Sequence, residues 1–216
     1  MSPLDIAGLV IFFLCSVVYH SSYYLVMRHY PQHTVKTRIN LYRRAWVEHI
    51  LRTKDYHLAV LQARGLININ TFLASASLIF IGVILNLLVN TDKVSGLGLI
   101  SLELFEIKIM LIVVVYSFSF FSFLSSLRNL RIFTMLIPTP RQVINKHSGI
   151  KAVDYFTRKV NKASGSYTLG SRSLYYSIPV FLWLVSPWLF ILSTLVMTAY
   201  FALRKDYRFR EKNNKD

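Results

Sequence analysis

The sequence predicts an all-α membrane protein with four transmembrane helices and two amphipathic interfacial helices on the cytoplasmic side. Apolar residues make up 54% of the 216 residues and charged residues only 16%, whereas a soluble domain carries about 25% charged residues. The apolar residues are also gathered in four long blocks, which basic segments separate. Because β-barrel strands would be shorter and would alternate in polarity, we expect helices, in a single membrane domain over residues 1–216.

Each apolar block is long enough to cross a bilayer, since a transmembrane helix needs about 20 apolar residues. The four blocks contain no charged residue and are Ile6–Met27, Leu66–Thr91, Ile109–Leu127 and Ser173–Leu203. The expected spans cover about residues 5–27, 66–90, 106–127 and 176–203. The first block has no basic segment before it and exceeds the roughly 7–15 residues of a signal-peptide core, which favours an uncleaved anchor. Residues 28–65 and 128–175 are then the long connections.

The 25 Lys and Arg residues predict the orientation, because they are more frequent in cytoplasmic loops. Residues 28–64 contain eight of them and residues 128–172 contain nine, whereas none precedes residue 28. We therefore expect the plasma (inner) membrane, with the N-terminus outside and both long connections in the cytoplasm. Four spans would place the six basic residues after Leu203 outside. A re-entrant fourth segment, broken at Pro179 or Pro187, is the alternative that returns them to the cytoplasm.

Both long connections contain apolar residues at helical spacing among basic ones. The first carries Ile39, Tyr42, Trp46 and Ile50, and the second carries Ile150, Val153, Phe156 and Val160. This pattern is typical of helices that lie in the membrane interface. Asp55 is expected to cap a helix that leads into the second block, and Ser148 to cap the helix of the second connection. Because the net charge of +15 flanks apolar blocks, we expect anionic phospholipids as partners and no nucleic acid.

Two of the expected spans carry stripes of small and polar residues. The second block contributes Asn68, Asn70, Thr71, Ser75 and Asn86, and the third contributes Ser119, Ser122, Ser126 and Asn129. Such stripes are typical of close helix packing with hydrogen bonds across the interface. The alternative is a pathway for a small solute. No ionisable residue lies in the middle of either block, which argues against ion-coupled transport.

No sequence pattern indicates catalysis, a metal or a cofactor. The sequence contains no nucleophile elbow, phosphate-binding loop, zincin motif or convergent pair of carboxylates. The single cysteine, Cys15, lies inside the first block and cannot form an internal disulfide. We therefore expect neither an enzyme nor a resident metal or cofactor.

Short motifs in a fixed order resemble a known family of membrane proteins. They are Tyr42-x3-Trp46, Gln62-x-Arg64-Gly65, Asn70–Ser75, Gly82, Lys108, Phe118–Phe121, Ser126-Leu127-Arg128, Gly170-x-Arg172-x2-Tyr175-Tyr176-x2-Pro179, Trp183 and Pro187. Their order resembles the family called domain of unknown function 599, and the resemblance extends from the first block to the fourth. It implies an integral membrane protein with several spans and no established reaction. The sequence departs from the family at Gly65, where an asparagine is expected.

If the shared motifs matter, the candidate functional residues are Arg64, Asn70, Ser75, Lys108, Arg128, Gly170 and Arg172. Arg64, Arg128 and Arg172 are expected at inner ends of spans, where they would bind a lipid phosphate or a carboxylate bidentately. The alternative is that they are anchors whose side chains snorkel to the membrane surface. We expect a non-catalytic accessory or scaffolding subunit, or an anionic-lipid-binding partner, that contacts another protein or itself within the membrane. The alternative function is a small-solute transporter or channel along the stripes of spans two and three.

Overall fold

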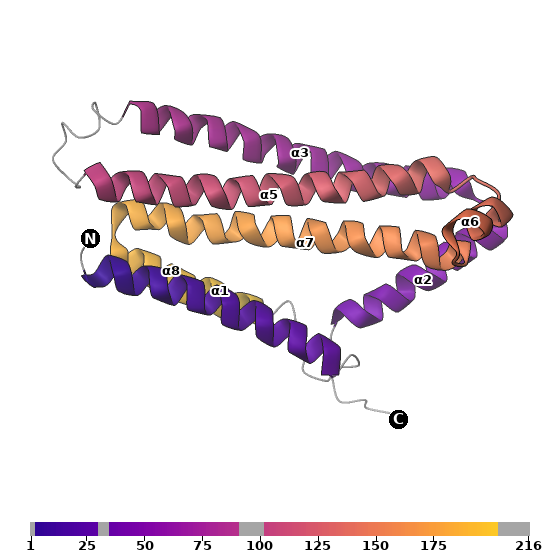
Figure 1. Ribbon diagram of the computed structural model, residues 1–216, viewed down its shortest axis with the longest axis horizontal. Helices are drawn as coiled ribbons and strands as arrows, with labels where there is room; N and C mark the ends of the chain where they lie inside the picture. The colour runs from indigo at the N-terminus through magenta and orange to yellow at the C-terminus, as the bar shows by residue number, and fades with distance from the viewer. Residues whose placement is uncertain (1–2, 30–34, 91–101, 203–216) are drawn as a thin grey trace, which may run out of the picture. The chain divides into compact units, whose positions relative to one another are not determined.

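Seven helices and no strand make up the residues that the computed structural model describes, which are 3–29, 35–90 and 102–202 (Figure 1). The helices are α1 (Pro3–His29), α2 (Val35–Thr53), α3 (Tyr56–Val89), α5 (Leu102–Leu136), α6 (Arg141–Ser148), α7 (Ala152–Val185) and α8 (Pro187–Tyr200). They divide into two compact units. We call residues 42–177 the central unit, and residues 1–41 with 178–216 the terminal unit. The predicted all-α class is confirmed.

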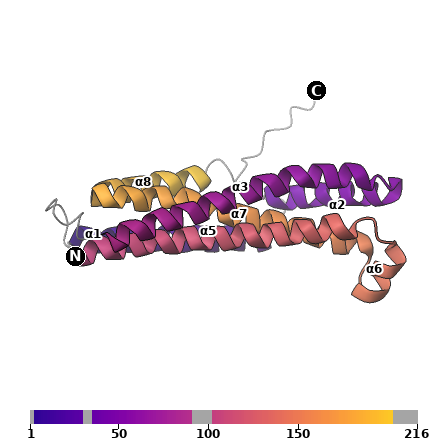
Figure 2. The ribbon, with the colours of Figure 1, turned by 90° about the horizontal axis from the view of Figure 1, so that it is seen from above.

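Three long helices run through the central unit. α3 has 34 residues and α5 has 35, and the two pack along each other (Figure 1 and Figure 2). The part of α7 up to Ser177 is joined to α5 by side-chain hydrogen bonds. Among the described helices, α3 and α5 are the two that are long and apolar enough to cross a membrane. At 1.5 Å per residue each is about 50 Å long, whereas the hydrocarbon core of a bilayer is about 30 Å thick.

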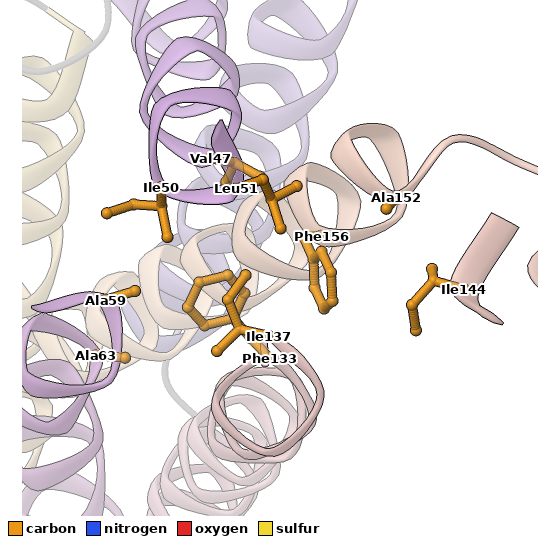
Figure 3. Close-up of a cluster of buried hydrophobic side chains, with 10 residues drawn as sticks. All are labelled: Val47, Ile50, Leu51, Ala59, Ala63, Phe133, Ile137, Ile144, Ala152 and Phe156. Carbon is orange, nitrogen blue, oxygen red and sulfur yellow. The ribbon is translucent and has the colours of Figure 1, made fainter. Parts of the chain in front are cut away.

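The three long helices continue past their apolar parts into a second packed region at one end of the central unit. Its core consists of the buried apolar residues Val47, Ile50, Leu51, Ala59, Ala63, Phe133, Ile137, Ile144, Ala152 and Phe156 (Figure 3). The rings of Phe133 and Phe156 meet edge to face, with centroids 5.9 Å apart. We call residues 42–65 and 128–163 the basic cap, because many exposed Lys and Arg side chains surround this core.

The expected amphipathic helices use their apolar faces to build the cap core. On α2, Val47 and Leu51 are fully buried, whereas Tyr42, on the face predicted to meet lipid, is 64% exposed. The helix predicted in the second connection is not a separate element. It is the first part of α7, which runs without interruption from Ala152 to Val185.

One of the two predicted helix caps is confirmed. The Asp55 carboxylate accepts a hydrogen bond from the Leu58 N–H at 3.2 Å and begins α3. The prediction for Ser148 is wrong, because Ser148 is the last residue of α6. Gly149 follows it with φ of 68°, a left-handed conformation that ends a helix at low cost in glycine. The first N–H of α7, at Ala152, donates instead to the Asn145 side chain at 2.7 Å.

In the terminal unit the fourth apolar block turns back on itself. Ser186 is extended, with φ of −158° and ψ of 137°, between the end of α7 and Pro187 at the start of α8. The rings of Trp183 and Phe190 stack 4.9 Å apart across this turn, and α8 runs beside α1 (Figure 1). The segment predicted as a single span over residues 176–203 is therefore not one continuous helix. Pro187 lacks an N–H and disfavours a helical conformation at the preceding residue, whereas Pro179 lies inside α7 without ending it.

The first predicted span, over residues 5–27, lies within α1, which belongs to the terminal unit and has 27 residues. Asp5, near the start of α1, is buried and accepts a hydrogen bond from the indole N–H of Trp183 at 2.8 Å. α8 has 14 residues, and a helix of that length extends about 21 Å. This is shorter than a hydrocarbon core, so α8 alone does not make a fourth span.

Candidate functional site

The contact between α5 and α7 is built from serine hydroxyls and backbone carbonyls. Ser119 on α5 donates to the Gly170 carbonyl oxygen at 3.0 Å. Ser173 on α7 donates in the opposite direction, to the Val115 carbonyl oxygen at 2.7 Å. Such reciprocal bonds are typical of helices that approach closely inside a membrane. Gly170 permits this approach, because a Cβ atom there would lie 2.9 Å from the Phe123 ring.

Two further pairs extend the same contact along both helices. The hydroxyls of Ser125 and Ser166 are 3.1 Å apart, and the Ser177 hydroxyl donates to the Tyr116 hydroxyl at 3.2 Å. Residues 166–177 of α7 therefore run antiparallel to residues 115–125 of α5. We call these two facing segments the hydroxyl layer.

The hydroxyl layer lies in the middle of the charge-free part of α5, residues 109–127. Residues 166–175, which belong to the predicted connection over 128–175, therefore pack against the third predicted span. The low hydropathy of this part of α7 concealed its position. The signal that could have found it is the spacing of Ser166, Gly170, Ser173 and Ser177, which recur at intervals of four, three and four residues on one helical face.

Arg172 is the charged residue of the hydroxyl layer. It is 6% exposed and lies on α7 one residue before Ser173. Ser125 and Ser166 are in contact, so they mark the same position along the two helices. Arg128 lies three residues beyond Ser125 on α5, and Arg172 lies six residues from Ser166 in the opposite direction on α7. The separation of the two arginines along the helices is therefore nine residues. At 1.5 Å per residue this separation is about 14 Å along the helices.

The sequence predicted that the three candidate arginines lie together at the inner ends of spans. The structure instead places Arg172 at a different position along the helices from Arg64 and Arg128. Arg64 and Arg128 are both exposed. The stacked rings of Phe80 and Tyr116 indicate that Arg64 and Arg128 lie within about one helical turn of each other along α3 and α5. Arg172 is separated from both, because it belongs to the long uninterrupted α7 rather than to the start of a span.

Lys108 is another of the candidate functional residues, and it is also buried. It is 3% exposed. The bond between Ser173 and Val115 places Arg172 eight residues from the level of Lys108, or about 12 Å. The buried cationic residues Lys108 and Arg172 therefore lie at two different positions along the long helices of the central unit. The exposed Arg64 and Arg128 lie at a third position.

The two polar stripes predicted on spans two and three do not face each other. On α3 the buried face consists of Ala59, Ala63, Asn70, Ala74, Ser77 and Ile84. Asn68, Thr71, Ser75 and Asn86 are exposed instead. Successive residues are about 100° apart around a helix, so a shift of two positions moves a stripe to nearly the opposite face. Asn70 differs from the rest of the stripe, and its amide donates to the Leu66 carbonyl oxygen at 2.7 Å.

On α5 the predicted stripe does lie inward. Ser119, Ser126 and Asn129 are buried, and Ser122 is half-buried. The Asn129 amide donates to the Ser125 carbonyl oxygen at 2.8 Å. The polar face of α5 thus meets serines of α7, of which Ser166 and Ser173 were predicted outside the spans and Ser177 inside the fourth.

The basic cap is held together by a few polar contacts and carries an excess of positive charge. Arg44 on α2 forms a 2.9 Å salt bridge with Asp154 on α7. Arg43 donates to the Ser164 hydroxyl at 2.6 Å, and its burial lowers the pKa of its guanidinium from the ordinary value. The exposed basic residues of the cap are Arg44, Arg52, Lys54, Arg64, Arg128, Arg131, Arg141, Lys146, Lys151, Arg158 and Lys162.

In the described ranges, no group of three His, Cys, Asp or Glu residues could hold a metal ion. Cys15 on α1 is half-buried and not in a disulfide. The arrangement described above therefore offers hydrogen-bond donors and positive charge.

The chain was compared with known families, curated proteins and solved structures. The model of a family described as a protein of unknown function, DUF599, matches residues 7–209, so the chain belongs to this family. The resemblance that the sequence motifs suggested is thereby confirmed. No curated protein and no solved structure matches the chain.

Proposed function

We propose that this member of the DUF599 family is an integral membrane protein in which α1, α3, α5 and α7 cross the bilayer, with the basic cap in the cytoplasm. The low burial of α3 and α5 supports a membrane, because only 17% and 39% of their most apolar windows are buried. The core helix of a soluble protein would be mostly buried. The polar side chains of α7 are compatible with a crossing because several of them bond to α5.

The turn at Ser186 supports the re-entrant alternative for the fourth apolar block. α7 then crosses toward the outside and α8 returns part of the way. The six basic residues after Leu203 would be cytoplasmic, in agreement with the positive-inside tendency. Cysteine labelling from either side of the membrane, in a Cys15→Ala background, tests this arrangement. A cysteine at Lys146 accessible only from outside would contradict it.

The function that the geometry supports best is that of a non-catalytic accessory protein that binds anionic phospholipids. The observation that carries this proposal is the position of Arg64 and Arg128 directly beside the ends of the apolar parts of α3 and α5, exposed and within about one turn of each other. Near an anionic membrane surface, each Lys or Arg contributes about 1 kcal/mol of attraction. A guanidinium group at such a position can add bidentate contacts to a lipid phosphate.

A contact with another protein, or with a second copy of this chain, forms the other part of the proposal. The exposed side chains of Asn68, Thr71, Ser75 and Asn86 lie on an otherwise apolar helix. Amide groups are poorly accommodated by lipid and hydrogen-bond across helix interfaces. The polar face of α3 is therefore the surface that we expect a neighbouring helix to cover.

Native mass spectrometry of the full-length protein, extracted from membranes that contain phosphatidylglycerol and phosphatidylcholine, tests lipid binding. We expect retained phosphatidylglycerol on the wild type and its loss in the double variant Arg64→Gln with Arg128→Gln. The matched control, Arg141→Gln with Lys146→Gln, removes the same charge from exposed positions on α6 and should retain the lipid. Equal retention in both double variants would contradict the proposed site.

A small-solute pathway is the second candidate, and the hydroxyl layer is the observation that favours it. The pathway would follow α5 and α7 rather than the two predicted stripes, because Asn68, Thr71, Ser75 and Asn86 of α3 are exposed and the hydroxyl layer joins α5 to α7. It predicts solute uptake by proteoliposomes that Ser122→Leu lowers and Ser75→Leu leaves unchanged. Proteoliposomes without uptake would leave the accessory function as the single proposal.

A further inference from the structure

We propose that α3 joins two copies of this chain as a parallel pair, through a seam on the helix face opposite the one that is buried inside the central unit. The pair rests on the membrane placement and the α3 contact proposed above, and its partner is a second copy of the chain. The seam consists of exposed residues at alternating intervals of four and three, which are Asn68, Phe72, Ser75, Ile79, Gly82 and Asn86.

The two opposite faces of α3 differ in what covers them. Ser77 is fully buried and lies nine residues from both Asn68 and Asn86, which corresponds to half a turn away around the helix. On the seam itself, Phe72 is 72% exposed and Ile79 is 66% exposed. From Asn68 to Asn86 the helix extends about 27 Å, close to the roughly 30 Å of a hydrocarbon core. The seam therefore follows α3 across the bilayer.

Polar side chains of the seam are not satisfied within the part of the chain that the structure describes. There, neither the Asn68 amide nor the Ser75 hydroxyl has a hydrogen-bond partner. The hydroxyl of Thr71, beside the seam, differs because it donates to the Ile67 carbonyl oxygen at 3.0 Å. Lipid tails offer neither donors nor acceptors, so a neighbouring helix that supplies both is favoured at the seam.

A second copy of the chain supplies the groups that this face lacks. An amide and a hydroxyl both donate and accept, so each can bond to the same group of a copy. Copies inserted in one orientation are related by a two-fold axis along the membrane normal, so their α3 helices are parallel and like residues meet. Residues 65–90 carry no charge, so this contact brings no like charges together and offers a charged partner no ion pair.

The order of large and small residues along the seam suits close packing. Phe72 and Ile79 alternate with the smaller Ser75 and Gly82, so large side chains of one helix fit between those of the other, as in a coiled coil. The average interval of 3.5 residues predicts a left-handed crossing of about 20°. At roughly 80 Å² for each of the six residues, one copy buries about 500 Å² and the pair about 1,000 Å², the size at which specific interfaces begin.

Disulfide cross-linking in membranes tests the seam, in a Cys15→Ala background that removes the single native cysteine. Helix axes about 8–10 Å apart bring facing Cα atoms to about 3.5–5.5 Å, which overlaps the range of a disulfide. We expect oxidation to give dimers of the Ser75→Cys and Gly82→Cys proteins. The controls are Ile69→Cys and Leu78→Cys, at positions 49% and 54% exposed but about a quarter turn to either side of the seam. Their dimer yield should be about tenfold lower.

A second substitution tests the contact without moving the cysteine. In the Ser75→Cys protein, Gly82→Leu adds a side chain where a Cβ atom meets nothing within 4 Å in a single chain, but it separates two helices packed at the seam. The dimer yield should fall by about tenfold. The matched control is Gly165→Leu on α7, where a Cβ atom also meets nothing within 4 Å, and it should cross-link as the parent does. Thermal unfolding in detergent shows whether both variants fold; if Gly82→Leu does not, the cysteine positions decide alone.

The outcomes separate this pair from the proposed function. The absence of disulfides between like positions of the seam overturns the pair, as does equal cross-linking at Ile69 and Leu78, or a folded Gly82→Leu protein that cross-links as Gly165→Leu does. Cross-linking of the seam to a chain of a different mass also overturns it, while keeping the proposed contact with another protein. Seam dimers in membranes without phosphatidylglycerol support the pair even where the lipid-binding function fails.

Discussion

Two glycines on α7, five residues apart, are predicted to respond to alanine with opposite signs. A Cβ atom at Gly170 would lie 2.9, 3.0 and 3.1 Å from three carbons of the Phe123 ring, and Phe123 is fully buried. Ordinary contacts begin near 3.4 Å, so the ring or the helix must shift by several tenths of an ångström. A Cβ atom at Gly165 would meet nothing within 4 Å.

The expected magnitudes follow from packing and helix propensity. Overpacking a dense interface costs about 1–3 kcal/mol, while replacing glycine by alanine inside a helix stabilises it by about 0.5–1 kcal/mol. Gly170→Ala should therefore lose about 1 kcal/mol net, and Gly165→Ala should gain about 0.5–1 kcal/mol. For a chain of this size, 1 kcal/mol corresponds to a change in Tm of about 2–4 °C.

Thermal unfolding of the two variants in detergent, followed by tryptophan fluorescence, measures these changes. Phe123→Leu removes the ring atoms that a Cβ atom at Gly170 would meet, so the double variant should be more stable than the sum of the two single changes predicts. A Gly170→Ala protein as stable as Gly165→Ala would refute the close approach of α5 and α7. Strict additivity with Phe123→Leu would refute the assignment of the clash to this ring.

Three other changes test separate parts of the chain. Phe156→Ala opens the core of the basic cap and should cost about 3–5 kcal/mol of unfolding free energy, measured by urea unfolding; a loss under 1 kcal/mol would contradict the packing of this cap. Asp5→Ala leaves the buried indole N–H of Trp183 without its carboxylate acceptor and should cost about 1–3 kcal/mol, whereas Asp5→Asn keeps an acceptor and should lose less in the same thermal assay; equal losses would argue against this bond. Asn68→Leu combined with Asn86→Leu should shift the protein toward monomer in light scattering, if α3 contacts a second copy. A wild type that is already monomeric would exclude self-association through this face.

Local signals in the sequence were sufficient to predict the helical class and several boundaries. The span expected over residues 106–127 lies within α5, and the one expected over residues 66–90 lies within α3 except for its last residue, because long apolar runs admit few alternatives to a helix. Asp55 was recognised as a cap because a short carboxylate before a helical run bonds to the free N–H groups of its first turn. These features depend only on residues that are close in the sequence, so a single sequence is enough to predict them.

Features that depend on tertiary packing were predicted less well. The stripe on α3 was expected at an interface, yet three of the six buried residues of α3 are the alanines Ala59, Ala63 and Ala74. A periodic pattern gives the relative directions of side chains on one helix, but it does not say which direction the neighbour occupies. The helix breaks at Ser186, because Pro187 disfavours a helical conformation at the residue before it. A proline alone did not decide the matter, since Pro179 is tolerated inside α7.

The position of α7 has a consequence for where function is sought in such chains. Hydropathy identifies helices that are long and apolar enough to cross a membrane, and it identified α3 and α5. A helix enclosed by other helices can carry serines and an arginine at the same depth, because its polar groups are satisfied by protein rather than by water. Arg172 was predicted at the end of a span because charge-free length was the criterion for a span. The same charge, together with the serine spacing of its own helix, indicates a helix whose side chains pack against other helices, in agreement with the burial of Arg172.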